Sequence, residues 1–168
     1  MSGAIGSHQS ARMGTDRWLT PLSIVHALGA FDLDPCGAPG HPTAATIYTP
    51  EADGDGLVMP WHGRVWLNPP YGSQSGAWLN KLADHGNGTA LVFARTETRM
   101  FFETVWRRAT AALFIEGRLT FLHPDGTPAK ANGGAPSVLV AYGVANAIAL
   151  KHSGIAGAFI PLSLERAA

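Results

Sequence analysis

The stretch Arg64-Val65-Trp66-Leu67-Asn68-Pro69-Pro70-Tyr71 decides the fold, because a short apolar run ends abruptly at two prolines. The apolar part predicts a buried strand. Proline has no N–H to donate and a fixed φ, so the strand cannot continue through it. The chain therefore leaves the sheet in a stiff turn that presents Asn68 and Tyr71. Open α/β sheets bind their ligands at such strand ends.

This polar and aromatic corner, residues 68–71, suits methyl transfer to the exocyclic amine of a nucleobase. The side-chain oxygen of Asn68 and the carbonyl of Pro69 can accept the two N–H hydrogens of an adenine amino group, which stabilises the positive charge that develops on the nitrogen. No general base is needed. Tyr71 can stack on the base, as in enzymes that flip a base out of the duplex. The simpler interpretation is a strand-ending turn with a surface tyrosine.

Outward from the corner, apolar runs that predict strands alternate with stretches that predict helices. Strands are expected at residues 31–34, 46–48, 64–67, 89–94, 111–115, 137–142 and 158–160, and helices at residues 21–28, 75–85, 98–106 and 146–152. Thr20, Ser75 and Thr98 are the expected N-caps, with Pro21 at the first helical position. This alternation predicts an α/β fold with a largely parallel sheet.

Length and composition narrow the function classes. The 168 residues, of which 46% are hydrophobic, suffice for one globular domain. We expect residues 1–17 to be a flexible segment and residues 18–168 to form a single domain. No apolar run reaches 18 residues, so no membrane span is expected. Cys36 is the only cysteine, which excludes an internal disulfide and fits the reducing cytoplasm.

Charge and histidine content add little. Lys and Arg number 12 and Asp and Glu number 12, so a net charge of zero gives no global support for nucleic-acid binding. The seven histidines show no paired ligand spacing, so no metal site is expected. The oligomeric state stays open, with a monomer favoured.

Several motifs resemble, in their order, the phage-type DNA N6-adenine methyltransferases (Dam-like). They are Thr20-Pro21, Phe31-Asp32-Leu33-Asp34-Pro35-Cys36, Asp55-Gly56-Leu57 and the run from Trp61 to Tyr71, and the likeness continues through residues 94–98, 117–121 and 137–140. The resemblance implies a Rossmann-like methyltransferase fold with helices on both faces of the sheet. It also implies S-adenosyl-L-methionine as methyl donor, adenine in duplex DNA as acceptor, and a phage or restriction-modification context.

The resemblance also implies roles for the donor-site residues. Thr20 and Pro21, at a helix start, would hold the methionine carboxylate. Asp34 would bind the ammonium group, while Pro35 and Cys36 shape the wall. Cys36 is not expected to act as a nucleophile, because no basic residue flanks it to lower the pKa of its thiol.

Asp55 would contact the adenine ring of the donor, with Asp53 in the same turn as an equally acidic alternative. Asn68 would border both donor and acceptor. One departure concerns the glycine-rich turn expected after the first strand, which is reduced to Gly37 and Gly40.

For DNA contacts, the candidates are Arg95, Arg118 and Lys130, which can bind phosphates or, for arginine, a guanine edge. The alternative is that the two arginines are solvated or paired with nearby acidic residues. The aromatic residues Trp78, Phe101, Phe102 and Trp106 have helical spacing and are expected in the core.

Adenine N6 methylation of DNA is thus the leading hypothesis, but two others stay open. The same corner would serve cytosine N4, an RNA base or a glutamine amide, since all of these acceptors are planar amines or amides. A different class is a non-catalytic nucleic-acid-binding module that keeps the fold. The intact corner counts against a pure binder, because such a protein has no need to activate an amine.

Overall fold

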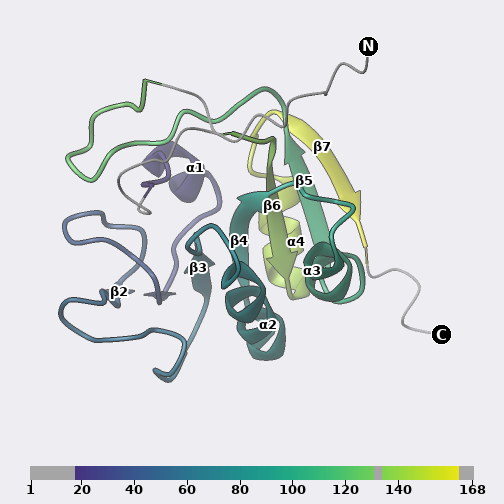
Figure 1. The fold of residues 1–168 in the computed structure, drawn as a ribbon. Coiled ribbons are helices and arrows are strands. Elements are labelled where there is room, and N and C mark those ends of the chain that lie inside the picture. Colours follow the sequence, from purple (N-terminus) through teal and green to yellow (C-terminus); the bar gives the residue numbers. More distant parts are fainter. Residues whose placement is uncertain (1–17, 131–133, 163–168) are drawn as a thin grey trace, which may run out of the picture.

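The computed structural model describes residues 18–130 and 134–162, and the segment 1–17 expected to be flexible lies outside them. Seven strands form one sheet in the order β2-β1-β3-β4-β6-β5-β7 (Figure 1). The strands are β1 (Leu33–Asp34), β2 (Thr46–Ile47), β3 (Val65–Leu67), β4 (Gly88–Phe93), β5 (Ala111–Ile115), β6 (Ser137–Tyr142) and β7 (Gly157–Pro161). The helices are α1 (Leu22–Ala27), α2 (Ser75–His85), α3 (Arg99–Phe101), the π-helical turn η1 (Phe102–Trp106) and α4 (Val144–Lys151).

The sheet is mixed, with its parallel half next to the corner. β2, β1, β3 and β4 pair in parallel, whereas β6 is antiparallel to β4 and β5, and β7 is antiparallel to β5. The predicted parallel pairing is therefore correct for the half from β2 to β4. It fails beyond β4 because the described residues of the connection from β5 to β6 form no helix, and antiparallel neighbours need no helical crossover.

Helices cover both faces of the sheet, and each face has its own apolar core. On one face, α2, α3 and η1 bury Trp78, Leu79, Phe101 and Val105 against the strands. On the other face, α1 and α4 do so with residues that include Val25 and Leu150. Within the described residues, no helix combines the length and the apolar character needed to span a bilayer.

Two helix starts differ from the prediction. Helix α1 begins at Leu22 with Pro21 as N-cap, and the Thr20 hydroxyl makes no capping bond. Thr20 instead lies in an extended segment, because neighbouring Leu19 pairs as an isolated β-bridge with Leu122. Helix α2 has Gln74 as N-cap, while the Ser75 hydroxyl donates to the carbonyl of Pro70.

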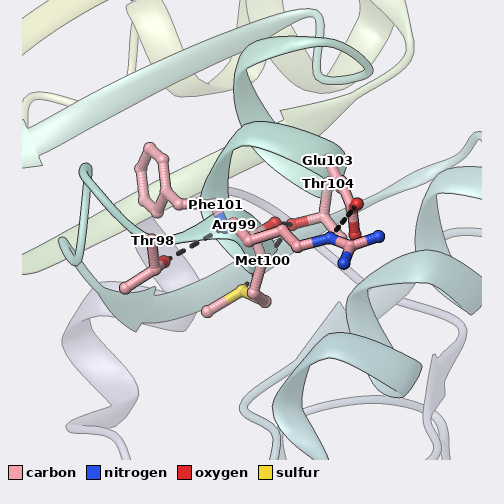
Figure 2. Close-up of polar contacts among 6 residues, drawn as sticks. All are labelled: Thr98, Arg99, Met100, Phe101, Glu103 and Thr104. Carbon is pink, nitrogen blue, oxygen red and sulfur yellow. Dashed lines mark hydrogen bonds and ion pairs between the residues drawn. The ribbon is translucent and has the colours of Figure 1, made fainter.

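The start of α3 agrees with the prediction and its continuation does not. The Thr98 side chain accepts a hydrogen bond from the Phe101 N–H at 3.2 Å, as an N-cap does (Figure 2). After α3 the helix widens to the π form, where the Arg107 N–H donates to the Phe102 carbonyl. Phe102, expected in the core, is 45% exposed, since the wider turn changes the angular spacing on which that expectation rests.

Candidate active site at the end of strand β3

The catalytic candidate Asn68 follows the fully buried strand β3 directly, and its amide has a defined orientation. Its Nδ2 donates to the carbonyl of Trp18 at 2.8 Å, and its Oδ1 accepts a 3.4 Å hydrogen bond from the Tyr71 hydroxyl. With the nitrogen committed to a carbonyl, the oxygen is fixed as the acceptor end of the amide. A serine holds the next residues, because Ser75 Oγ donates to the Pro70 carbonyl at 2.7 Å.

Tyr71 is held by aromatic contacts. One ring face stacks on Phe93 at the end of β4, with ring centroids 4.2 Å apart and 13° between planes. Phe121, from the connection between β5 and β6, approaches edge-on at 6.1 Å. Burial raises the pKa of the Tyr71 hydroxyl, with a smaller contribution from Cys36, so the tyrosine stays protonated and can donate to Asn68. The ring is therefore fixed in plane as well as in position.

A cavity of about 120 Å³ joins this corner to the loop after β1. It brings together nearly all of the residues that the sequence singled out for catalysis and donor binding: Thr20, Asp34, Pro35, Cys36, Asp55, Asn68, Pro69, Pro70 and Tyr71. Pro21 does not line it. The walls also include residues that the sequence analysis missed, namely Trp18, His41, Thr43 and Trp78. No pattern in the sequence distinguishes these four from ordinary loop and core residues.

Asp34 is a buried carboxylate on the cavity wall. Its Oδ1 accepts from the Cys36 N–H at 3.0 Å, and its Oδ2 accepts from the Thr43 hydroxyl. Burial raises the pKa of the Asp34 carboxyl from 3.8 to about 6, although both hydrogen bonds oppose the rise. Among the described residues, no cationic side chain forms an ion pair with it. A buried charge without a partner is unfavourable, and a cation in the cavity would offset that cost.

The segment 18–20 lines the cavity as a strap that contacts three loops. Leu19 and Leu122 exchange two backbone hydrogen bonds of 2.9 and 2.8 Å. The carbonyl of Trp18 holds Asn68, and the carbonyl of Thr20 accepts from the ring of His41 at 3.0 Å. The Thr20 hydroxyl is buried and makes no hydrogen bond. A buried hydroxyl without a partner on a cavity wall is a candidate ligand contact.

Asp53 and Asp55 share one turn but have different surroundings. Asp55 lines the cavity, and its Oδ1 accepts from the Leu57 N–H at 2.9 Å. Asp53 instead accepts from the Thr49 N–H at 2.9 Å within the turn and does not line the cavity. Gly56, the next residue after Asp55, packs against the loop after β1. The position requires glycine, because a Cβ there would stand 1.9 Å from the Pro35 carbonyl oxygen.

Cys36 connects the loop after β1 to the corner of residues 68–71. Its thiol donates to the main-chain carbonyl of Asn68 at 3.1 Å. A thiol that acts as a hydrogen-bond donor is protonated, and a protonated thiol is a poor nucleophile. The contact agrees with the expected role of Cys36 as a wall residue.

The three candidate DNA-contacting cations are exposed and lie outside the cavity. Arg95 follows β4, Arg118 follows β5, and Lys130 precedes β6. Because β6 is antiparallel to its neighbours, its start lies at the same sheet edge as the ends of β3, β4 and β5. In Figure 1 the connection from β5 to β6 extends across this edge above α1. Residues 131–133 of this connection lie outside the described residues.

Comparison with known proteins adds a family match. The model of the family described as DNA N-6-adenine-methyltransferase (Dam) matches residues 7–148. No curated protein and no solved structure matches the chain. Within the described part of the chain, no group of three or more His, Cys, Asp or Glu side chains is placed to hold a metal ion.

Proposed function

The chain belongs to the DNA N-6-adenine-methyltransferase (Dam) family, and we propose that it transfers a methyl group from S-adenosyl-L-methionine to the N6 amine of adenine in DNA. One observation carries this proposal. The cavity that begins at Asp34 and Thr20 ends at the corner of residues 68–71, so a donor and an acceptor amine can meet there. We further propose that the fold is the Rossmann-like methyltransferase fold, in one domain, which the order β2-β1-β3-β4 with its parallel pairing supports.

At the corner, the acceptor amine acts as a hydrogen-bond donor. Asn68 Oδ1 and the Pro69 carbonyl accept its two N–H hydrogens, and the Trp18 carbonyl keeps the Asn68 oxygen on the acceptor side. Both oxygens then stabilise the positive charge that develops on the nitrogen during transfer. The ring of a flipped adenine packs beside Tyr71, and stacking on Phe93 fixes the orientation of the Tyr71 ring.

The residues on the donor side fit the charged groups of S-adenosyl-L-methionine. The donor supplies a methyl group bound to a positively charged sulfur. The unpartnered hydroxyl of Thr20 can donate to its carboxylate, and the unpaired carboxylate of Asp34 can bind its ammonium group. Asp55 can accept from its adenine, while Pro35 and Cys36 form the wall between donor and corner.

DNA would approach the sheet edge that carries the corner. Arg95, Arg118 and Lys130 are exposed along that edge, where they can contact phosphates on either side of a flipped base. We propose a cytoplasmic location, because a DNA substrate and a chain with one cysteine fit that reducing compartment.

The proposal is tested with purified protein and donor labelled on its methyl group, offered duplex DNA, RNA and glutamine-containing peptide in parallel. We expect label in duplex DNA alone, recovered as N6-methyladenine after digestion to nucleosides. Label recovered as N4-methylcytosine, or in RNA or peptide only, would show that the acceptor is not adenine in DNA. If calorimetry also detects no donor binding by the folded protein, the non-catalytic binding module is the correct alternative.

A further inference from the structure

The loop of residues 37–43 follows Asp34 and leads toward β2, where a glycine-rich turn was expected. It turns on itself through two backbone hydrogen bonds, from the His41 N–H to Ala38 and from the Thr43 N–H to His41. His41 and Thr43 are 8% and 5% exposed, so this loop sends two polar side chains into the interior. Buried polar side chains in a connecting loop need partners, and the identity of the partners indicates what the loop does.

Both partners are donor-site residues that come from other segments of the chain. The Thr43 hydroxyl donates to Oδ2 of Asp34 at the end of β1. The ring of His41 donates to the carbonyl of Thr20, in the strap before α1, at 3.0 Å. The two side chains thus connect the loop to Asp34 and to Thr20, the two residues proposed to bind the charged groups of the donor.

Glycine still matters at one point of the loop. A Cβ on Gly37 would stand 2.4 Å from Ile47 and 3.1 Å from the Asp34 carboxylate. The backbone of Gly37 therefore packs directly against Asp34. The Asp34 carboxylate accepts its hydrogen bonds from the Thr43 hydroxyl and the Cys36 N–H.

We propose that His41 and Thr43 are positioning residues that hold Thr20 and Asp34 in the geometry that binds the methyl donor, in place of a glycine-rich turn. This inference rests on the proposed function. Thr43 fixes the rotamer of Asp34 and keeps its carboxylate ionised, and His41 fixes the strap so that the Thr20 hydroxyl faces the cavity. Neither side chain needs to touch the donor.

Thr43→Val tests the first half, because it removes the hydroxyl and keeps the shape. We expect donor affinity, measured by calorimetry at pH 7.5, to fall roughly tenfold or more, as for loss of a hydrogen bond to a charged group. The decline of affinity on acidification should also begin at higher pH, since the hydrogen bond from Thr43 lowers the pKa of Asp34. Thr43→Ser should restore both properties.

The matched control is Thr89→Val, at a buried threonine in β4 whose hydroxyl has no hydrogen-bond partner. It should bind the donor like the parent protein over the same pH range. The other titratable groups on the cavity wall are Cys36, His41, Asp55 and Tyr71. Repeating the pH series with His41→Gln separates the titration of the histidine from that of Asp34.

His41→Leu tests the second half. We expect the KM for donor to rise roughly tenfold, because the Thr20 carbonyl loses its partner, and kcat to fall by a smaller factor, because the strap also holds Asn68 through the Trp18 carbonyl. His41→Gln retains an N–H near the position of Nε2 and should restore most of the affinity. His26→Leu, at an exposed histidine on α1, is the control for loss of an imidazole.

The outcomes separate this inference from the proposed function. Parent-like donor affinity and parent-like pH dependence in Thr43→Val and His41→Leu, in a parent protein that methylates DNA, would overturn the positioning roles alone. Equal loss in Thr43→Val and Thr89→Val would overturn them as well, because it would indicate a general packing effect. A folded parent protein that binds no donor would overturn both proposals.

Discussion

At the scale of single residues, the orientation of the Asn68 amide connects structure to chemistry. The amide is held from its nitrogen end by a main-chain carbonyl, and no side-chain substitution at Trp18 removes that carbonyl. The acceptor oxygen is therefore set by the backbone of the strap. Preorganised acceptors aimed at a developing charge are effective because they need no rearrangement during the reaction.

Asn68→Ala should slow methyl transfer strongly and leave donor binding intact. Loss of one preorganised contact in a transition state costs about 3 kcal/mol, roughly a hundredfold in kcat. Single-turnover kinetics and calorimetry measure the two quantities. Asn80→Ala, at an exposed asparagine whose side-chain oxygen accepts a hydrogen bond from Arg108, is the control and should react normally. Unchanged kcat in Asn68→Ala would refute the assigned role.

Asp34→Asn should stabilise the fold while it weakens donor binding. The raised pKa of about 6 means that ionised Asp34 destabilises the protein at neutral pH, by about 3 kcal/mol at most for a rise of this size. An amide keeps both hydrogen bonds, since the Thr43 hydroxyl can turn to accept. We expect a higher free energy of unfolding at pH 7.5 by about 1–3 kcal/mol, measured by urea denaturation.

The pH dependence of the parent protein follows from the same shift. Between pH 3.8 and about 6 the folded state binds the Asp34 proton more tightly than the unfolded state, so this group destabilises the fold as pH rises through that window. Asp34→Asn should lack this contribution, and donor binding by the parent should weaken below about pH 6. A variant with reduced stability at pH 7.5 would contradict the account.

At the scale of elements, a hydroxyl residue at a helix start does not always cap that helix. Ser75 and Thr98 both precede or open a helix, but only Thr98 acts as a cap. Ser75 donates instead to the carbonyl of Pro70, in the proline-stiffened turn. The helix start thus supports the corner of residues 68–71.

Thr98→Ala should destabilise the protein by about 1 kcal/mol, as removal of an N-cap side chain does. The cap lies outside the cavity, so donor affinity should stay the same. Urea denaturation measures the first effect and calorimetry the second, with Thr98→Ser as the variant that keeps the cap. A stability loss in Thr98→Ser as large as that in Thr98→Ala would show that the hydroxyl is not the cause.

Strand positions could be predicted well where a buried strand is a largely apolar run. The ranges expected for β5 and β6 coincide with those observed. Helical detail could be predicted less well. The π-helical turn after Phe101 depends on a hydrogen bond one residue longer than in an α-helix, and apolar spacing does not encode that choice.

At the scale of the whole molecule, strand order brings distant parts of the chain together at one sheet edge. The antiparallel insertion of β6 between β4 and β5 places the ends of the connection from β5 to β6 beside the corner. Two contacts join this connection to the corner and the strap. The ring of Phe121 contacts that of Tyr71, and the backbone of Leu122 pairs with that of Leu19. A segment proposed to contact DNA therefore also contacts Tyr71, which is proposed to pack beside the acceptor base.

Replacing Arg95, Arg118 and Lys130 together by alanine should weaken DNA binding without changing donor affinity. Each lost phosphate contact lowers the slope of log affinity against log salt by roughly 0.9, so the three should reduce it by up to about 3. Fluorescence anisotropy with labelled duplexes at several salt concentrations measures this. Arg107→Ala, at another exposed arginine, is the control. An unchanged salt slope would place the DNA elsewhere.

The sequence predicted the residues of the cavity far better than it predicted their supports. Asn68 and Asp34 stand in motifs through which the chain resembles the family, and both line the cavity. His41 and Thr43 lie in a loop rich in glycine and proline, and their importance depends on contacts with Thr20 and Asp34 that only the folded chain brings about. Such long-range contacts leave no periodicity in the sequence.

The most direct measurement is modified-base sequencing of DNA from cells that express either the parent protein or Asn68→Ala at equal levels. The account predicts N6-methyladenine at defined sites with the parent protein, and none above background with the variant. Absence of modified adenine with the parent, modification of a different base, or equal methylation by both proteins would contradict it.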